Sequence, residues 1–252
     1  MSGMNPAEFA NIAKSEKDFW WYRGMRSILF RMLDPLLAGR RIHRALEAGC
    51  GTGYFSRQLQ AERGLPVIPM DLGWEGLQYA RSMGVQRAVQ ANALQLPFPA
   101  AAFDLVLSLD VMPHFARGEE TRAVAELARV LEPGGLLVIR TAALDLLRSR
   151  HSEFVYEQQR YTRGQLVSLA RGAGIRVLRC TYANSLLMPV ALAKFRLWEP
   201  LTRQNPGSGV EAVSPWLDRV LNSALTAEAA WIGSGRDFPI GQSLILIGEK
   251  IG

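Results

Sequence analysis

A glycine-rich turn between an apolar strand and a helix constrains this 252-residue chain more than any other feature. The stretch Arg44-Ala-Leu-Glu-Ala-Gly-Cys-Gly-Thr-Gly-Tyr-Phe-Ser56 begins with an alternating apolar run typical of a buried parallel strand, and Tyr54–Arg63 favours a helix. Glycines at such a turn let the backbone bend sharply and let a ligand approach the free N–H groups of the following helix. We therefore expect an α/β fold with a cofactor loop at Gly49–Gly53.

The spacing of the glycines separates several classes of ligand. A nicotinamide-binding turn needs its third glycine one place later than Gly53, and a P-loop needs a Gly-Lys-Ser/Thr sequence that is missing here. Glu47-Ala-Gly-Cys-Gly-Thr-Gly53 instead resembles the first motif of the class I S-adenosylmethionine-dependent methyltransferases, of the type 11 kind. An ordinary glycine-rich turn without a ligand is the alternative.

Further segments resemble the same family in the expected order. Pro66–Asp71 is a short predicted strand that ends on an acid, and Asn92-Ala-Leu-Gln-Leu-Pro-Phe98 resembles the family's D-A-x-x-L-P-F segment with asparagine in place of aspartate. Ala102–Asp110 resembles the fourth strand, and the Pro-Gly-Gly sequence at Pro133–Gly135 resembles the motif that follows the fourth helix. The order of these matches identifies the family more firmly than any single motif does.

The resemblance implies a doubly wound, Rossmann-like α/β fold with a seven-stranded sheet, an antiparallel last strand and helices on both faces. We expect one methyltransferase domain, because the chain length and 48% hydrophobic content suit a single core. Its predicted parts are an N-terminal helical lid (1–40), a cofactor-binding core (41–183), a helical insertion (184–240) and a final strand (241–252). The remaining predicted strands are Gln86–Gln90, Leu136–Arg140, Ile175–Tyr182 and Pro239–Lys250.

The family's cofactor, S-adenosylmethionine, is implied by the same resemblance. Asp71 would accept hydrogen bonds from the ribose hydroxyls, with capping of the next helix as the alternative role. Asn92 and Ala93 would contact the adenine, where an amide oxygen accepts a weaker bond than a carboxylate. Glu47 would orient the loop or reach the amino group. The full predicted cofactor set is Glu47, Gly49, Cys50, Gly51, Gly53, Asp71, Leu72, Asn92, Ala93, Leu94, Asp110, Tyr22 and Arg23; no metal site is predicted.

Four consecutive aromatic residues, Phe19–Tyr22, lie between predicted N-terminal helices within Pro6–Leu37. They cannot all face one core, so the segment either packs on the sheet edge or forms a lid over the cofactor site. It resembles the helices that precede the domain in some family members. Tyr22, Arg23 and Arg26 are therefore candidates for the methionine carboxylate or the substrate, since arginine binds carboxylates in a planar fork.

The segment Asp110–Phe115 follows the clearest predicted strand, where cofactor and acceptor meet in this family. His114 is the candidate general base, because an ordinary pKa near ~6.5 lets histidine take a proton at neutral pH. A structural role for His114 is the alternative, since many small-molecule methyltransferases need no strong base. His151 and Arg160 are further candidates for contact with the acceptor.

The insertion Leu186–Asp237 contains two apolar helical stretches around the loop Gln204–Gly209. Three interpretations are open. Its helices pack against the edge of the sheet, or they form an apolar acceptor pocket, or they form a membrane-surface patch helped by nearby cations. The cations are Lys194, Arg196, Arg203 and Arg219.

Charge and cysteine content limit the partners. The net charge of +6 is spread over scattered basic residues, so we expect no nucleic-acid partner. Two cysteines without zinc spacing, a charged N-terminus and no ~20-residue apolar run indicate a cytoplasmic, soluble protein with reduced thiols.

The predicted function is methyl transfer from S-adenosylmethionine to a small-molecule or lipid-like acceptor, with peripheral membrane contact left open. A cofactor-binding protein without transferase activity and a dinucleotide-dependent oxidoreductase are the alternatives. The sequence predicts neither the acceptor atom (O, N or C) nor the oligomeric state.

Overall fold

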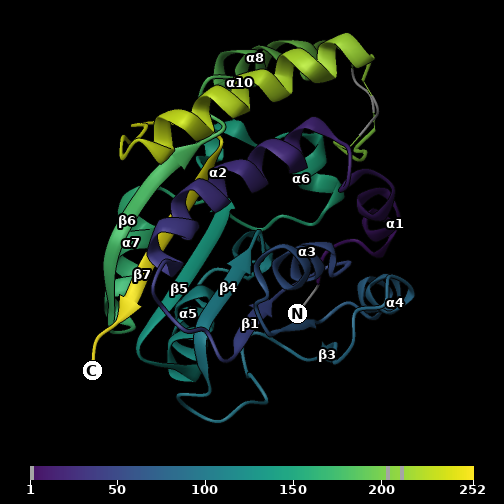
Figure 1. Ribbon diagram of the computed structural model, residues 1–252. Coiled ribbons are helices and arrows are strands. Elements are labelled where there is room, and N and C mark those ends of the chain that lie inside the picture. Colours follow the sequence, from purple (N-terminus) through teal and green to yellow (C-terminus); the bar gives the residue numbers. More distant parts are fainter. Residues whose placement is uncertain (1–2, 203–204, 211–212) are drawn as a thin grey trace.

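A seven-stranded sheet in the order β3-β2-β1-β4-β5-β7-β6 runs through the protein (Figure 1). The computed structural model describes residues 3–202, 205–210 and 213–252. Neighbouring strands are parallel from β3 to β5, whereas β7 is antiparallel to both β5 and β6. The predicted doubly wound sheet with an antiparallel last strand is therefore confirmed. The strands are β1 (Ala45–Ala48), β2 (Val67–Asp71), β3 (Val89–Gln90), β4 (Phe103–Leu109), β5 (Leu131–Ala142), β6 (Ile175–Ala183) and β7 (Ser243–Lys250).

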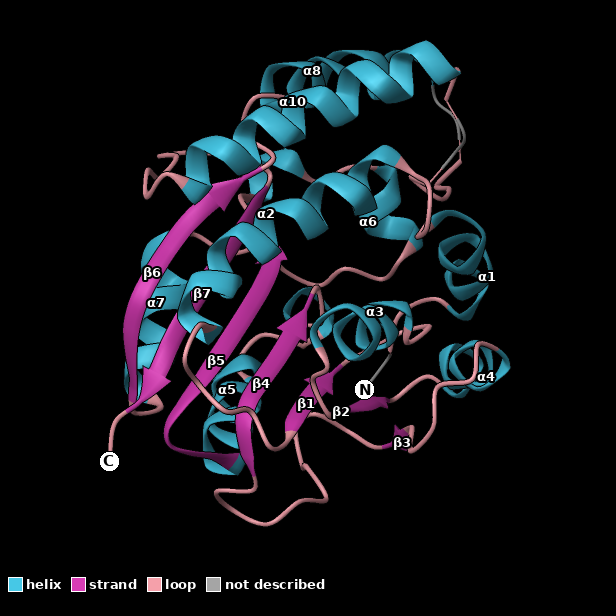
Figure 2. Cartoon of the chain, viewed as in Figure 1, coloured by secondary structure: helices cyan, strands magenta, loops and turns pink. Residues whose placement is uncertain are grey.

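Helices cover both faces of the sheet (Figure 2). The helices are α1 (Pro6–Ser15), α2 (Trp20–Leu37), α3 (Tyr54–Arg63), α4 (Trp74–Ser82), α5 (Glu119–Val130), α6 (Arg150–Phe154), α7 (Arg163–Gly172), α8 (Met188–Ala193), α9 (Glu199–Thr202) and α10 (Pro215–Gly233). A π-helical turn, Lys194–Trp198, joins α8 to α9. Short 3-10 turns lie at Met112–His114 and Asp145–Leu147.

Alternation along the strands sorts the buried side chains into two cores. In β4, Leu105 and Leu107 pack with α2 and α3, whereas Val106 between them packs with α5 on the other face. In β7, Ile245 and Leu246 face opposite cores in the same way. Successive strand residues point to opposite faces, so a strand buried on both sides is apolar at every position. This explains the near-continuous apolar runs in the sequence.

Several predicted strands differ from the observed ones; β7, for example, begins at Ser243 rather than at Pro239. The predicted strand Gln86–Gln90 shrinks to β3, because Arg87 adopts a left-handed conformation (φ 61°) that ends an extended run. β5 begins at Leu131, five residues earlier than predicted. Its pairing with β4 shifts register after Leu131, and Gly134 at φ 80° lies within this irregular stretch. A bulge thus accommodates the Pro-Gly-Gly sequence within the strand.

The last helix of the insertion packs on α2 and on the sheet core beneath it. α10 lies along α2, with Leu225, Ala229 and Ile232 buried in the core that α2 shares with the sheet (Figure 1). Gly24 of α2 permits this close approach, because a Cβ at that position would lie 2.3 Å from Leu225 Cδ1. Arg203 and Gln204, which the sequence analysis singled out, lie outside the described residues. No described helix is both long and apolar enough to cross a bilayer.

Candidate functional site

A cleft of about 1250 Å³ opens at the carboxyl ends of the central parallel strands. Its floor comes from the turn after β1 and from the ends of β2, β4 and β5, while its walls come from α1, the start of α2, α8 and the first turns of α10. Ligands bind at this edge in open α/β sheets, where the connections diverge to either face. Of the predicted set, the cleft is lined by Glu47, Gly49, Cys50, Gly51, Asp71, Leu72, Asn92, Ala93, Asp110, Tyr22 and His114.

The glycine loop follows β1 and is fixed to β2. The N–H groups of Gly49 and Cys50 donate to the Met70 carbonyl at 2.7 and 2.9 Å. Gly49 has φ 90°, and a Cβ there would lie 1.9 Å from Val111 Cγ2. Gly51 also has a positive φ, 55°, but a Cβ on it would meet no described atom within 4 Å. The loop therefore needs glycine at both positions, and it presents an open backbone surface to the cleft at Gly51.

Gly53 and Leu94, two other predicted contacts, do not line the cleft. Gly53 (φ 74°) is the N-cap of α3 and faces Ala80 of α4, so it sets the entry of the helix. Leu94 is buried, and its N–H donates to Asn92 Oδ1 at 2.8 Å. These two residues shape the turns from which the cleft-lining atoms project.

Asp71 ends β2 and holds two turns together. One carboxylate oxygen accepts from Gly51 N and the other from Gly73 N, both at 2.7 Å. Burial raises the pKa of Asp71, while these backbone N–H groups act in the opposite direction. The side chain bonds the residue before α4, which is the alternative role, and it also lines the cleft, where contact with a ribose stays a prediction. Each carboxylate oxygen retains a second lone pair that can accept from a ligand.

Asp110 and Arg140 form an ion pair across the ends of β4 and β5. Arg140 Nη2 lies 2.6 Å from Asp110 Oδ2, and the guanidinium carbon is 5.2 Å from the centroid of the Trp21 ring. Arg140 is only 8% exposed, so its charge depends on this partner for stabilisation. Asp110 itself has φ 60°, a conformation that is uncommon for residues other than glycine and clusters at functional sites.

His114 lies in the 3-10 turn after β4 and faces the cleft. Its Nδ1 is buried and has no hydrogen-bond partner among the described residues. Burial lowers the pKa of His114, although Glu157 and Asp110 oppose this effect. The imidazole is therefore neutral at neutral pH, and one buried ring nitrogen can serve a ligand.

Two buried carboxyl groups, Glu47 and Glu16, flank the glycine loop. Ser56 Oγ donates to Glu47, and Thr52 Oγ1 donates to Glu16. Burial raises the pKa of Glu47 to about 8 and that of Glu16 to about 7. A positively charged ligand would stabilise the ionised form of these buried carboxyl groups, so the pair favours a ligand with a positive charge.

The two arginines of the N-terminal segment have other partners than those predicted. Arg23 pairs with Asp218 of α10 and does not line the cleft. The ion pair directs the Arg23 side chain toward α10, and contact of Arg23 with the cofactor stays a prediction. Arg26 lines the cleft but donates to the backbone carbonyls of Glu16 and Lys17. Tyr22 lies in the cleft, and burial raises its pKa above the usual range.

Several cleft residues on α1 and near α6 were not predicted. Glu8 is 1% exposed, accepts from Ser208 Oγ at 2.9 Å and lies 4.0 Å from His151 Nδ1. Glu16 is the C-cap residue at the other end of α1. Phe9, Ile12 and Glu16 follow i, i+3, i+7 spacing, so a carboxyl group on the inward face of the first helix was a readable signal.

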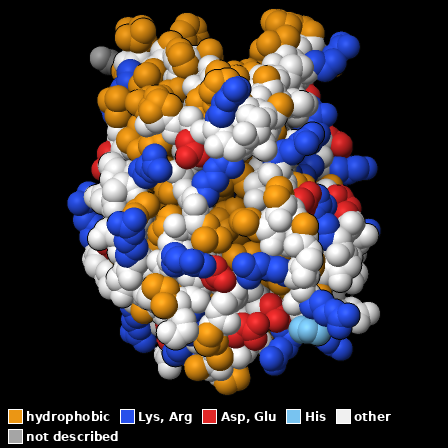
Figure 3. Space-filling view, turned by 60° about the vertical axis from the view of Figure 1, so that its left-hand side comes forward, with side chains coloured by type: hydrophobic (Ala, Val, Ile, Leu, Met, Phe, Trp, Pro, Cys, Tyr) orange, Lys and Arg blue, Asp and Glu red, His pale blue; other side chains and the backbone are white. Residues whose placement is uncertain are grey.

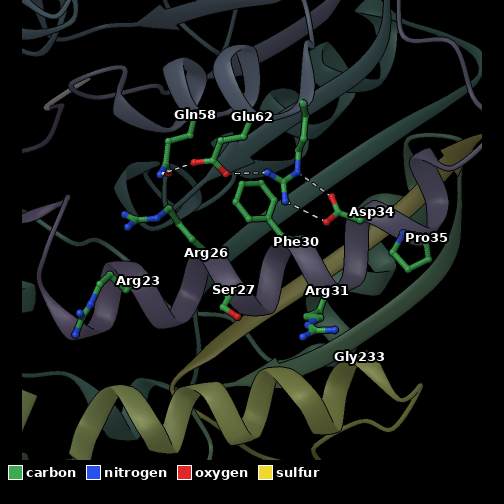
Figure 4. Close-up of a pocket in the computed structure, with 11 residues that line it drawn as sticks. Arg23, Arg26, Ser27, Phe30, Arg31, Asp34, Pro35, Gln58, Glu62 and Gly233 are labelled. Atoms are coloured by element: carbon green, nitrogen blue, oxygen red, sulfur yellow. Dashed lines mark hydrogen bonds and ion pairs between the residues drawn. The ribbon is translucent and has the colours of Figure 1, made fainter. Parts of the chain in front are cut away.

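A second hollow, of about 560 Å³, lies between α2, α3 and the end of α10 (Figure 4). Arg63 binds Asp34 with two hydrogen bonds of 2.9 and 3.0 Å and pairs with Glu62. Its guanidinium carbon also lies 3.3 Å from the centroid of the Phe30 ring. Since the charged groups at its centre neutralise one another, this hollow is the weaker candidate for a ligand site.

Comparison with known proteins agrees with the fold. Residues 46–139 match a family described as "Methyltransferase domain". The malonyl-[acyl-carrier protein] O-methyltransferase of Enterobacter lignolyticus is 36% identical over 130 residues, which are 50% of this chain and 51% of that protein. "Probable tRNA methyltransferase 9B" of Homo sapiens is 35% identical over 108 residues, 42% of this chain and 23% of that protein. The structure of an S-adenosylmethionine-dependent methyltransferase from Archaeoglobus fulgidus matches with a TM-score of 0.59 at 18% identity, covering 93% of this chain and 97% of its own.

Residues 46–139 are therefore a methyltransferase domain of the class I S-adenosylmethionine-dependent family. S-adenosylmethionine is the cofactor of that family. The matches span between 23% and 51% of the length of these curated relatives, and the structural likeness at 18% identity shows the fold alone.

Proposed function

We propose that this protein transfers a methyl group from S-adenosylmethionine to a small-molecule or lipid-like acceptor that binds in the same cleft. The observation that carries the proposal concerns Gly51. No atom lies within 4 Å of the position that a Cβ would take there, and the Gly51 N–H donates a hydrogen bond to the cleft-lining carboxylate of Asp71. A Cβ at Gly51 would project into the space that a ligand needs. The residues present fit a ligand that is positively charged at one end and carries hydroxyl groups.

Each predicted contact has a place in this proposal except Arg23 and Asp110. Backbone groups of Gly49, Cys50 and Gly51 would hold the methionine end, with Glu47 and Tyr22 beside it. Asp71 and Leu72 would hold the ribose, and Asn92 and Ala93 the adenine. Gly53 and Leu94 would act through the turns that they shape. When bound, S-adenosylmethionine supplies a methyl group on a positively charged sulfonium.

The chain's own residues would position the acceptor and exclude water. Methyl transfer needs the acceptor atom in line behind the methyl carbon, so placement of the two reactants accounts for most of the catalysis. Trp20 and Trp21 would cover the cleft from the α2 side. His114 Nδ1, neutral and without a partner among the described residues, would accept a proton from an O–H or N–H acceptor.

An apolar part of the cleft wall supports an acceptor with apolar character. The insertion contributes Leu187, Ala191 and Phe195 from the α8 side and Leu217 and Leu221 from α10. The relatives act on different acceptors by their names, malonyl-[acyl-carrier protein] in one and tRNA in another. The composition of this wall is the reason to place a small or lipid-like acceptor first.

Calorimetric titration with S-adenosylmethionine and S-adenosylhomocysteine tests the proposal without knowledge of the acceptor. We expect micromolar binding that Asp71→Ala weakens by about 1.5–3 kcal/mol, the scale of a lost hydrogen bond to a charged group. Asp104→Ala is the matched control. Asp104 Oδ2 also accepts two backbone N–H groups, from His43 and Arg44, but lies outside the cleft.

A pair of glycine variants separates cleft effects from folding effects. Gly51 and Gly64 both have positive φ, 55° and 65°, with no atom within 4 Å of an added Cβ. Replacing either by alanine carries a similar backbone cost of about 1–2 kcal/mol. Only Gly51→Ala should abolish cofactor binding. Binding that is absent in the wild type, or equal in both variants, would refute the proposed site.

A further inference from the structure

The outer side of the helical insertion carries an unusual set of exposed apolar residues, which we call the outer patch. Figure 3 shows hydrophobic side chains gathered at the upper end of the molecule, where Figure 1 places α8 and α10, with lysine and arginine atoms beside them. Leu201 is 79% exposed, and the two tryptophans of the patch are each 62% exposed. The outer patch consists of Val190, Leu197, Trp198, Leu201, Trp216 and Val220.

Helical spacing places these residues on continuous outward stripes. Val190, Leu197 and Leu201 follow i, i+7, i+11 spacing along the run from α8 to α9, and Trp216 and Val220 are four residues apart on α10. Single exposed apolar residues are common, but six on two helical runs, two of them tryptophans, indicate a surface that contacts something else. Both helical runs thus present apolar faces that no described element covers.

Charge around the outer patch distinguishes between partners. Lys194, Arg196 and Arg219 are exposed on the same two helical runs. The neighbouring acids are turned inward: Glu199 accepts from Arg150 N at 3.0 Å, and Asp218 accepts from Trp20 N at 3.0 Å. The described part of the surface is therefore apolar and cationic. Tryptophan and leucine beside lysine and arginine favour the interface of an anionic bilayer, where the rings enter the headgroup region and the cations meet lipid phosphates.

The outer patch is continuous with the cleft. Val190 and Trp198 belong to the patch and also line the cleft, as does Lys194 between them. Inward of them, Leu187 and Phe195 continue the apolar wall. A surface that touched the patch would therefore lie at the mouth of the cleft.

We propose that the outer patch docks the protein on an anionic membrane surface. The docked bilayer would face the apolar mouth of the cleft, so that a lipid-tailed acceptor reaches it without crossing water; this implication for the acceptor rests on the proposed function, whereas the docking does not. The apolar side chains would insert into the headgroup region. The cations would make the protein prefer anionic lipid.

Vesicle co-sedimentation of the full chain tests the docking. We expect binding to vesicles of phosphatidylcholine with phosphatidylglycerol and weaker binding to phosphatidylcholine alone. Leu197→Ser/Leu201→Ser should weaken binding at least about tenfold, because the variant lacks two apolar side chains that would leave water on binding. Neither leucine lines the cleft. The matched control is Leu178→Ser/Ile251→Ser, which removes two exposed apolar residues that do not belong to the outer patch.

Two further variants test the charge and the orientation. Arg196→Gln/Arg219→Gln should reduce the preference for anionic lipid. The control Arg122→Gln/Arg171→Gln should not reduce it, because these arginines lie on α5 and α7, which cover the other face of the sheet. Leu201→Cys labelled with an environment-sensitive dye should shift to the blue on vesicles, and Ile251→Cys should not. The native thiols of Cys50 and Cys180 are buried, which favours selective labelling.

The outcomes are separable. Equal vesicle binding by wild type and the Leu197/Leu201 variant, or none by wild type, would overturn the docking. A wild type that dimerises without binding vesicles, and becomes monomeric in that variant, would show that a second copy covers the patch and would equally overturn it. Calorimetry with S-adenosylmethionine on the same samples separates the two proposals, since failure of cofactor binding contradicts only the proposed function.

Discussion

At the scale of single residues, burial tunes the groups that face the cleft. His114 combines a lowered pKa with a ring nitrogen that lacks a partner among the described residues. A closely paired carboxylate would instead raise the pKa of the histidine, and the imidazolium form has no lone pair to accept a proton. The fold therefore supplies a neutral base at the place where the acceptor is proposed to lie.

We predict that the imidazole of His114 titrates below its ordinary value of 6.5, because burial disfavours the charged form. Histidine signals followed by NMR from pH 4 to 8 measure this without an acceptor, and His114→Gln assigns the signal. Once an acceptor is known, this variant should retain cofactor binding and lose about 10²–10⁴ in turnover if the base is needed. Titration at or above the ordinary value would contradict the assignment.

At the scale of elements, one glycine decides how the insertion packs. Gly24 of α2 faces Leu225 of α10 so closely that an added Cβ would overlap its side chain, at 2.3 Å from Cδ1. The ion pair between Arg23 and Asp218 joins the same two helices one residue away. The close packing of α2 on α10 brings Arg23 next to Asp218, and the Arg23 side chain does not line the cleft.

We predict that Gly24→Ala destabilises the protein by about 1–3 kcal/mol, because overpacking forces the two helices apart. The control is Gly164→Ala in α7, where no atom lies within 4 Å of the new Cβ. There the change should be neutral or stabilising by up to about 1 kcal/mol, since alanine is the better helix former. Urea unfolding measures both, and equal effects would argue against tight packing of α10 on α2.

At the scale of the whole molecule, buried carboxyl groups link stability to pH. Glu47 has its pKa raised to about 8 in the folded state, against an ordinary 4.5. The folded protein then binds more protons than the unfolded chain between these values. The stability that this group contributes is full below pH 4.5 and is lost as the pH rises toward 8.

We predict that the free energy of unfolding of the wild type, relative to Glu47→Gln, falls as the pH rises from 4.5 to 8. The control is Glu126→Gln, where Arg129 lowers the pKa of the carboxyl. In that case the wild-type advantage is lost as the pH falls below 4.5, which is the opposite direction. Urea titrations at several pH values measure both differences. A flat profile for Glu47→Gln would mean that Glu47 is ionised in the folded protein.

The core of the fold could be predicted because its signals are local. The alternating strand at Ala45–Ala48, the positive-φ glycines and the acid at the end of β2 each follow from backbone sterics and strand periodicity. β3 was predicted too long because the left-handed Arg87 leaves no pattern in the sequence. The cleft position of Asp71 and His114 was predictable for the same reason, since strand ends of a parallel sheet share one edge.

By itself the sequence determined the order of strands and helices, the glycine loop and the family that they resemble. Only the tertiary structure decided which partner each long side chain takes: Arg23 binds α10, and Glu8 and Glu16 of the first helix turn into the cleft. The physical reason is the distance along the chain over which each kind of interaction acts. Periodicity and backbone conformation act over a few residues, whereas an ion pair or a buried carboxyl group depends on segments that are up to 200 residues apart in the chain and meet only on folding.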